Sequence, residues 1–306
     1  MTAPTSVTAT LSSIGDYIRW GASRFSGAGL CFGHGTANAI DEAAALVLHA
    51  IHQPHNLATG FFACTLTPDE REAVVDLIER RVRERVPAAY LVGEAWFCGL
   101  PFYVDERVLV PRSPIAELIE QRFSPWLEDP DQVTDILDLC TGSGCIAIAC
   151  GMAFPDARVD AVDISPAALE VARINVVKHD MADQVHPLEG DLYAGLKGRR
   201  YDLIVSNPPY VNSAEWQGLP AEFHAEPRIG LESGTDGLEC ARRILREAEA
   251  HLKPGGILIV EVGSSAETLE RAYPDIPFCW LDFERGGDGV FLLTAEQLAE
   301  HRVAEV

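Results

Sequence analysis

Apolar residues recur at helical spacing along the N-terminal part of the chain. Three stretches show this pattern, at residues 14–25, 41–52 and 68–86. The third begins with Thr67-Pro68-Asp69-Glu70, a capping box with proline at the first helical position. The pattern predicts a small helical domain over residues 1–90.

The charged residues of this domain fit a solvated surface better than a binding site. The third stretch carries the arginines Arg80, Arg81, Arg83 and Arg85. They are compatible with an RNA or protein contact, but Glu79 and Glu84 interleave with them, so we expect a solvent-exposed helix face. Three histidines have metal-like spacing: His49, His52 and His55. Because Pro54 ends the helix before the third one, we expect no metal ion.

Residues 91–112 change to a β-rich pattern. Two runs, 96–104 and 108–110, are joined by Asp105-Glu106-Arg107, which predicts a β-hairpin linking the helical domain to the rest of the chain. Arg112 follows this hairpin directly. It could bind an acidic group of a ligand, or it could fix the hairpin to the domain that follows.

Short apolar runs alternate with helical stretches from residue 113 to the end of the chain. Such alternation predicts a parallel sheet with helices on both faces. The expected strands are 134–139, 158–163, 185–188, 201–206, 256–262, 278–283 and 289–293. The last two are expected to form a hairpin around Gly286-Gly287. The sequence therefore predicts an α/β domain over residues 113–306 with a seven-stranded, mostly parallel sheet.

The charge balance bears on the partners of the protein. Lysine and arginine number 24 against 46 aspartate and glutamate, a formal net charge of −22 over 306 residues. A protein that tracks nucleic-acid phosphates needs a basic face, so no direct nucleic-acid specificity is expected. The acidic surplus is compatible with a basic protein partner, since complementary charge speeds encounter, and equally with solubility alone.

The cysteines and the N-terminal sequence indicate a cytoplasmic protein. None of the eight cysteines belongs to a C-x-x-C pair, and most have apolar neighbours, as buried thiols do in a reducing compartment. Residues 1–10 lack the basic patch and apolar core of a secretory signal. No stretch approaches the length and hydrophobicity of a membrane span, so no membrane association is expected.

A glycine-rich turn and two acids mark the expected cofactor pocket. Gly142-Ser143-Gly144 joins the first strand of the sheet to a helix, which lets a ligand approach the backbone. Asp163, at the end of the second strand, can accept hydrogen bonds from both hydroxyls of a ribose, and Asp191, after the third, from an adenine amino group. Either acid could instead be an ordinary turn residue. The turn lacks the third glycine of the dinucleotide fingerprint, which disfavours NAD, and the Gly-Lys-Ser/Thr of a phosphate P-loop, which excludes that class.

The fourth predicted strand ends in Asn207-Pro208-Pro209-Tyr210. Neither proline has an N–H, and a residue before proline avoids the helical region, so the carbonyl groups here have few local donors. The side-chain oxygen of Asn207 and the backbone oxygen of Pro208 can together accept both N–H bonds of one planar NH2 group. Tyr210 could pack on such a group, although ordinary core packing explains it as well.

These motifs resemble those of class I S-adenosylmethionine-dependent methyltransferases. Residues 138–144 resemble the first motif of that class, Asp163 its second-strand acid, and Asn-Pro-Pro-Tyr the motif of amino-group methylators. Cys140 stands where the class often has glycine, which concerns the local backbone angle. The resemblance implies a Rossmann-like fold, S-adenosylmethionine as methyl donor and S-adenosylhomocysteine as product. The cofactor-binding residues it implies are Asp138, Thr141, Gly142, Ser143, Gly144, Asp163, Ile164, Asp191, Leu192 and Asn207.

The resemblance narrows to the protein-glutamine methyltransferases that modify release factors or ribosomal proteins. Residues 95–115, 33–36, 224–227 and 286–291 look like the branch acting on the large-subunit ribosomal protein uL3. The release-factor branch typically continues its Pro-Arg with Pro-Asp-Thr-Glu, whereas this chain has Ser113-Pro114-Ile115-Ala116. The resemblance covers nearly the whole chain and implies that the substrate is a glutamine of basic uL3.

For such an enzyme we expect Asn207, Pro208 and Tyr210 to be catalytic. The two oxygen acceptors would orient the amide nitrogen and stabilise the positive charge that develops on it. A protonated N-methyl amide is strongly acidic, so no general base is assigned. Substrate contacts are expected from Asn207, Pro208, Pro209, Tyr210, Arg112 and Glu226. The helical domain is expected to recognise the substrate.

Three alternatives stay open. The chain could modify release factors, or it could methylate the amino group of a flipped adenine in DNA or RNA, which the same motif suits. The net charge opposes the nucleic-acid alternative. It could also be a non-catalytic scaffold that binds a ribosomal protein through its acidic surface.

Overall fold

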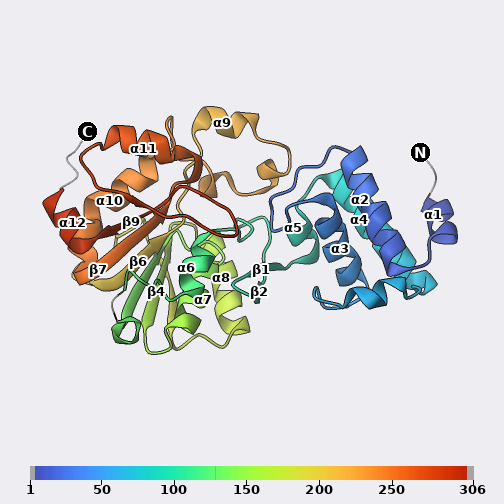
Figure 1. The fold of residues 1–306 in the computed structure, drawn as a ribbon, viewed down its shortest axis with the longest axis horizontal. Coiled ribbons are helices and arrows are strands. Elements are labelled where there is room, and N and C mark those ends of the chain that lie inside the picture. The colour runs from blue at the N-terminus through green and yellow to red at the C-terminus, as the bar shows by residue number, and fades with distance from the viewer. Residues whose placement is uncertain (1–3, 128, 302–306) are drawn as a thin grey trace. The chain divides into compact units, whose positions relative to one another are not determined.

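The computed structural model describes residues 4–127 and 129–301, which form two compact units (Figure 1). The first unit comprises the chain up to Glu94 together with Pro220–Ala225, a segment from far along the sequence. The second unit comprises Ala95–Leu219 and the chain from Glu226 onward. The predicted division at residue 90 leaves out the later segment that joins the first unit.

The first unit is helical. Its α-helices are α1 Pro4–Thr10, α2 Ile14–Gly27, α3 Ala39–Ala50, α4 Pro68–Glu84 and α5 Ala88–Val92, with the 3-10 helices η1 Thr59–Ala63 and η3 Phe223–Ala225. Ser13 and Thr67 begin α2 and α4 with capping boxes, and that of α4 is the one predicted. α4 ends at Glu84 because Arg85 adopts a left-handed conformation, with φ 54°. The apolar faces of these helices bury Tyr17, Phe25, Leu46, Val74 and Ile78.

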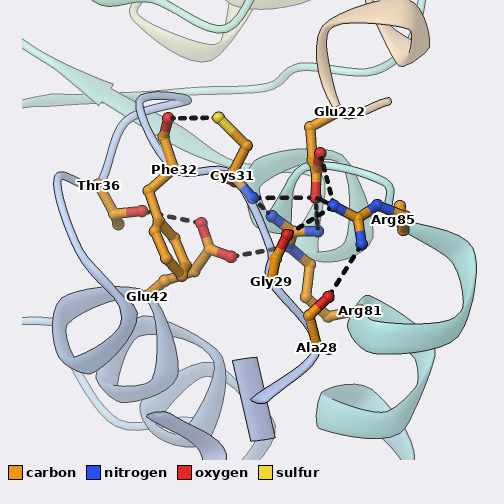
Figure 2. Close-up of polar contacts among 9 residues, drawn as sticks. All are labelled: Ala28, Gly29, Cys31, Phe32, Thr36, Glu42, Arg81, Arg85 and Glu222. Atoms are coloured by element: carbon orange, nitrogen blue, oxygen red, sulfur yellow. Dashed lines mark hydrogen bonds and ion pairs between the residues drawn. The ribbon is translucent and has the colours of Figure 1, made fainter. Parts of the chain in front are cut away.

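Arg81 of α4 is completely buried, so the expectation of a solvent-exposed arginine face is wrong at this position. It follows Ile78 by three residues and therefore lies on the same, inward face of the helix. Its Nε donates to Oε1 of Glu42 at 2.7 Å, and its Nη2 donates to the carbonyl oxygen of Cys31 at 3.1 Å (Figure 2). Its Nη1 lies 3.5 Å from Oε1 of Glu222. Arg81 and the partly exposed Arg85, which lies 3.0 Å from Glu222, together balance the two buried carboxylates.

A two-stranded antiparallel hairpin, β1 Ala95–Phe97 and β2 Leu100–Phe102, begins the second unit. Its turn is Cys98-Gly99, both with positive φ, at 48° and 72°. The predicted pairing of residues 96–104 with 108–110 is therefore wrong, since the chain reverses inside the first run. Residues 108–110 belong to no strand.

The second unit is built on a seven-stranded sheet in the order β5-β4-β3-β6-β7-β9-β8. The strands are β3 Asp135–Leu139, β4 Arg158–Asp163, β5 Val185–Glu189, β6 Tyr201–Ser206, β7 Leu252–Glu261, β8 Cys279–Trp280 and β9 Val290–Thr294. β9 pairs antiparallel with both β7 and β8, and the other pairings within this sheet are parallel. The predicted seven-stranded, mostly parallel sheet is confirmed, although β8 is shorter than expected.

Helices cover both faces of this sheet (Figure 1). The α-helices of this unit are α6 Ile115–Glu120, α7 Cys145–Ala153, α8 Pro166–Lys178, α9 Ser213–Gly218, α10 Glu239–His251, α11 Ala266–Ala272 and α12 Ala295–Glu300, and its 3-10 helices are η2 Pro130–Gln132, η4 Arg228–Gly230 and η5 Gly263–Ser265. Alternate strand residues face opposite ways, so Ile136 packs with α6 and α7 while Leu137 packs with α10 and α12. The core is therefore two apolar layers separated by the sheet.

The strand order places the polar motifs at one edge. β3 pairs in parallel with both β4 and β6, so the chain winds in opposite directions from this central strand. In register, Leu139 lies opposite Val162 on one side and Ser206 on the other. The segments that follow these three strands therefore emerge together, at the switch point where open α/β sheets bind ligands.

Candidate active site

A cavity of about 330 Å³ lies at this carboxyl edge of the sheet, entirely within the second unit. Its volume is within the range of small-molecule sites. Of the predicted site residues, it is lined by Arg112, Thr141, Gly142, Ser143, Asp163, Ile164, Asp191, Leu192, Asn207, Pro209 and Tyr210. Asp138, Gly144, Pro208 and Glu226 are not part of its lining.

Asp138 holds the glycine-rich turn in place through hydrogen bonds to residues on either side of it. The Asp138 carboxyl is completely buried and accepts hydrogen bonds from the Thr141 hydroxyl and from the backbone N–H of Ala147 at 3.1 Å. Burial raises the pKa of Asp138 to about 7, although these hydrogen bonds lower it. Gly142 has φ 55°, and a Cβ added there would meet no atom within 4 Å. The turn thus leaves open space above its backbone, which fits a ligand that approaches closely.

Asp163 connects the ends of two strands. Its Oδ2 accepts from the backbone N–H of Gly142 at 2.8 Å, and its Oδ1 accepts from that of Ser165 at 2.8 Å. Asp163 therefore does act as a turn residue, which is one of the two roles that the sequence leaves open for it. Each carboxylate oxygen retains a further lone pair, so the same side chain can still accept from a ligand in the cavity. Burial raises the pKa of Asp163 above its ordinary value.

Asp191 follows β5 and faces a partner that the sequence did not suggest. Its carboxylate pairs with the guanidinium of Arg243, on α10, at 2.8 Å, and both residues line the cavity. Nearby, the side chain of Ile164 is 51% exposed, an apolar surface open at the cavity. Together they offer the mixed apolar and polar wall that suits a purine ring.

The Asn207-Pro208-Pro209-Tyr210 motif emerges from the end of β6 beside the glycine-rich turn. Asn207, Pro209 and Tyr210 line the cavity, whereas Pro208 is buried and does not belong to the lining. The backbone carbonyl of Tyr210 accepts from the Ser265 hydroxyl at 2.8 Å, and its side-chain hydroxyl donates to Glu261 at 3.1 Å. The motif is therefore anchored at its C-terminal end.

Arg112 and Glu226 bind each other. Nη1 and Nη2 of Arg112 donate to the two carboxylate oxygens of Glu226 at 2.6 Å and 2.7 Å, a bidentate pair. Glu226 also accepts from the backbone N–H of Val110 at 3.0 Å. Of the two roles left open for Arg112, the geometry supports fixing the segment after the hairpin to the later loop.

Further residues that reasoning from sequence missed complete the cavity wall. They are Arg107, Val108, Leu109, Val110, Pro111, Ser113, Cys140, Cys145, Ile146, Val162, Gly190, Val211, Pro227, Ile229, Gly230, Leu231, Glu232, Ser233, Glu239, Cys240, Arg243 and Glu261. Many come from segments without a periodic pattern of their own, so no local signal marks them. Glu261 is an exception, because a charged residue that ends a buried apolar strand is itself a signal.

The described residues offer neither a metal cluster nor a membrane helix. Among them, no three His, Cys, Asp or Glu side chains are grouped so as to hold a metal ion. Within residues 4–127 and 129–301, no helix combines the length and apolar character needed to cross a membrane.

Comparisons with known proteins agree with this architecture. Residues 124–272 match the family model described as the Methyltransferase small domain. Among solved structures, the hMettl16 catalytic domain, solved in complex with a MAT2A 3'UTR hairpin, is similar with a TM-score of 0.50 at 15% identity, covering 74% of this chain and 80% of that one. At this identity the likeness shows the fold alone. The class I methyltransferase fold is thereby confirmed.

Two curated relatives are similar over almost their full length. Both are named ribosomal protein uL3 glutamine methyltransferase. The protein of Francisella tularensis is 48% identical over 96% of this chain and 94% of its own length. That of Xylella fastidiosa is 53% identical over 95% of this chain and 93% of its own. The chain belongs to the family of ribosomal protein uL3 glutamine methyltransferases.

Proposed function

We propose that this protein transfers a methyl group from S-adenosylmethionine to the side-chain amide nitrogen of a glutamine in ribosomal protein uL3. The observation that carries the proposal is the position of Asn207 at the cavity beside the open turn at Gly142. An acceptor suited to a planar NH2 group thus borders space for a nucleoside-bearing ligand. The names of the relatives supply the substrate.

The chain's own residues fit the proposed methyl donor. Its sulfonium supplies an electrophilic methyl group. Asp163 would accept hydrogen bonds from the ribose hydroxyls, and Ile164 would pack on the adenine ring. Acceptors in the segment Asp191-Leu192 would bind the adenine amino group. Asp138 and Gly144 would act indirectly, because they shape the turn that Thr141, Gly142 and Ser143 present to the cavity.

Asn207 and Pro208 would prepare the nitrogen for attack. An amide nitrogen is a poor nucleophile because its lone pair is delocalised into the carbonyl group. The Asn207 side-chain oxygen and the Pro208 carbonyl oxygen would accept its two N–H bonds and orient it. The partial negative charges of these two oxygens would stabilise the positive charge that develops on the nitrogen. The resulting N-protonated methyl amide is strongly acidic and would lose its proton to water. Tyr210 would pack on the flat amide.

The rest of the chain would serve substrate recognition. We assign recognition of uL3 to the helical part over residues 1–90, and catalysis to residues 113–306, with residues 91–112 as the linker.

The net charge of −22 favours a basic ribosomal protein as partner over a nucleic acid. A ribosomal protein substrate would place the enzyme in the cytoplasm. The Arg112–Glu226 pair would order the loop at the substrate side of the cavity.

A comparison of candidate substrates tests this function. The enzyme is incubated with radiolabelled S-adenosylmethionine and, separately, with uL3, a peptide chain release factor, and adenine-containing DNA and RNA. Label is expected in uL3 alone. Label in the release factor would move the chain to the other branch, and label in nucleic acid would favour adenine methylation. No label in any sample would favour the scaffold alternative.

A further inference from the structure

Glu261 is a buried carboxylate at the cavity that the proposed mechanism does not use. It is the last residue of β7, is 5% exposed, and lines the cavity. Its Oε1 accepts a hydrogen bond from the hydroxyl of Tyr210 at 3.1 Å, and its Oε2 accepts one from the hydroxyl of Ser113 at 2.6 Å. Two hydroxyl groups from distant parts of the sequence thus share one carboxylate.

The remaining surroundings of Tyr210 leave its ring little freedom. A Cβ on Gly263 would lie 2.6 Å from Cε2 of the ring, and a Cβ on Gly237 would lie 2.3 Å from the Tyr210 carbonyl oxygen. Both glycines have positive φ, at 43° and 78°. Because no side chain fits at such distances, backbone packs directly on Tyr210. The hydroxyl bond to Glu261 fixes the far end of a ring that is otherwise held by shape.

A carboxylate at this place costs free energy that an apolar side chain would not. Burial raises the pKa of Glu261 to about 7. The hydroxyls of Ser113 and Tyr210 and the positive charge of Arg112 lower this pKa, while the carboxylate of Asp288 raises it. A costly charged group that holds a cavity-lining ring indicates a role beyond packing.

We propose that Glu261 is a positioning residue for methyl transfer, whose carboxylate fixes the Tyr210 hydroxyl and so the ring on which the substrate amide rests. The inference rests on the proposed function, and it adds a residue to it. Tyr210 follows Asn207 by three residues in a proline-stiffened segment. A tilted ring would therefore shift the amide nitrogen relative to its acceptors, and displacements near 1 Å cost large factors in rate.

The protonation state of Glu261 decides how many hydrogen bonds it accepts. The carboxylate accepts from both hydroxyls, whereas the protonated acid carries a hydrogen that disturbs one of the two bonds. Its pKa in the folded protein, about 7, lies above its ordinary value of 4.5, so protonation sets in near neutrality and increases as the pH falls. We therefore expect kcat to fall below about pH 7 as one group is protonated.

Three variants and one matched control test the proposal: Glu261→Gln, Tyr210→Phe, the double variant, and Glu117→Gln. Glu117 is a buried glutamate of the same unit that accepts from the backbone N–H groups of Glu284 and Arg285 and does not line the cavity. Turnover of uL3 is measured from pH 5.5 to 9, with calorimetry for S-adenosylmethionine affinity. In parallel, NMR of ¹³C-labelled tyrosine follows the Tyr210 ring, whose signal is assigned by its loss in Tyr210→Phe.

Glu261→Gln and Tyr210→Phe should each lower kcat by about tenfold to a hundredfold, the scale of one hydrogen bond to a charged group. The double variant should be no worse than the more impaired single variant, because both substitutions act on the same contact between the Tyr210 hydroxyl and the Glu261 carboxylate. Affinity for S-adenosylmethionine should stay within about twofold. In the wild type and in Glu117→Gln, kcat should fall on the acidic side of about pH 7, and the Tyr210 signal should shift over the same pH range. Both changes should be absent in Glu261→Gln.

Any of three results would overturn the inference. They are wild-type turnover in Glu261→Gln, effects of the two substitutions that multiply in the double variant, and a Tyr210 signal that does not change with pH. A wild-type enzyme that never methylates uL3 would contradict the proposed function instead. The tyrosine signal needs no substrate, so it would still decide whether Glu261 holds the ring.

Discussion

Arg81 and Glu222, 141 residues apart in the sequence, meet inside the first unit, where both side chains are fully buried. Glu222 also lies 3.0 Å from the guanidinium of Arg85 and accepts from the backbone N–H of Cys31 at 3.1 Å (Figure 2). The segment Pro220–Ala225 therefore completes the buried polar cluster of a helical unit that is otherwise built from the chain up to Glu94.

Glu222→Gln should destabilise this unit. The change leaves the buried Arg81 with Glu42 as its remaining carboxylate partner, and breaking a buried ion pair costs about 3 kcal/mol. Chemical denaturation monitored by circular dichroism measures this loss. Glu79→Gln is the control, since its pair with Arg24 is partly exposed and worth about 1 kcal/mol or less. Equal stability losses in the two variants would contradict the assignment.

The Glu222 contribution should also depend on pH. Burial raises its pKa, but hydrogen bonds from backbone N–H groups and the charges of Arg85 and Arg81 outweigh this, and the net pKa lies below the ordinary 4.5. A depressed pKa contributes stability above the unfolded-state pKa that is lost as the pH falls through the folded one. The stability difference between wild type and Glu222→Gln should therefore shrink below about pH 4.5 and stay constant between pH 5 and 7.

Asn207→Ala should lower turnover strongly without abolishing cofactor binding. The variant loses one of the two proposed acceptors of the amide, so kcat should fall by roughly a hundredfold or more. Calorimetry should show S-adenosylmethionine affinity close to that of wild type. Asn212→Ala is the matched control, because Asn212 caps α9 in the same loop and is not part of the cavity wall. An active Asn207→Ala enzyme would remove Asn207 from the mechanism.

Asp163→Asn should weaken cofactor affinity. The amide can still accept one backbone N–H but is a poorer acceptor for ribose hydroxyls, so we expect a loss of about 1–3 kcal/mol in binding free energy. Isothermal titration with S-adenosylhomocysteine measures it. Asp156→Asn, at an exposed position before β4, should bind like wild type. If Asp163→Asn bound equally well, Asp163 would be a turn residue alone.

Arg112 and Glu226 should act as one unit. If they serve by binding each other, Arg112→Ala, Glu226→Ala and the double variant should raise KM for uL3 or lower kcat to a similar extent. Independent contacts of each residue with the substrate predict effects that multiply instead. Steady-state kinetics of the three variants against wild type distinguishes the two cases.

Features set by neighbours in sequence were predictable. The Thr67 capping box, the strands of the parallel sheet and the strand end at Asn207 each follow from a local pattern of residue types. Because parallel strands share a carboxyl edge, their terminal motifs could be expected at one place. Most of the site residues predicted from these patterns line the cavity.

Features set by distant pairing were not predictable. No residue near Arg81 in the sequence indicates that Glu222 pairs with it, so the local pattern predicts a solvent-exposed arginine. The partner of Asp191 is an arginine on α10, and the hairpin turn depends on two residues with positive φ rather than on the longer polar segment. Long-range ion pairs and turn geometry need the fold before they can be seen.

Site-resolved mass spectrometry of uL3 tests the central claim most directly. Purified unmodified uL3 is incubated with S-adenosylmethionine and either wild-type enzyme or Asn207→Ala, then digested and fragmented. The account predicts that a single glutamine gains the mass of one methyl group on its side-chain nitrogen with the wild type, and at most a trace with the variant. Methylation on any other residue type, or equal modification by both enzymes, would contradict it.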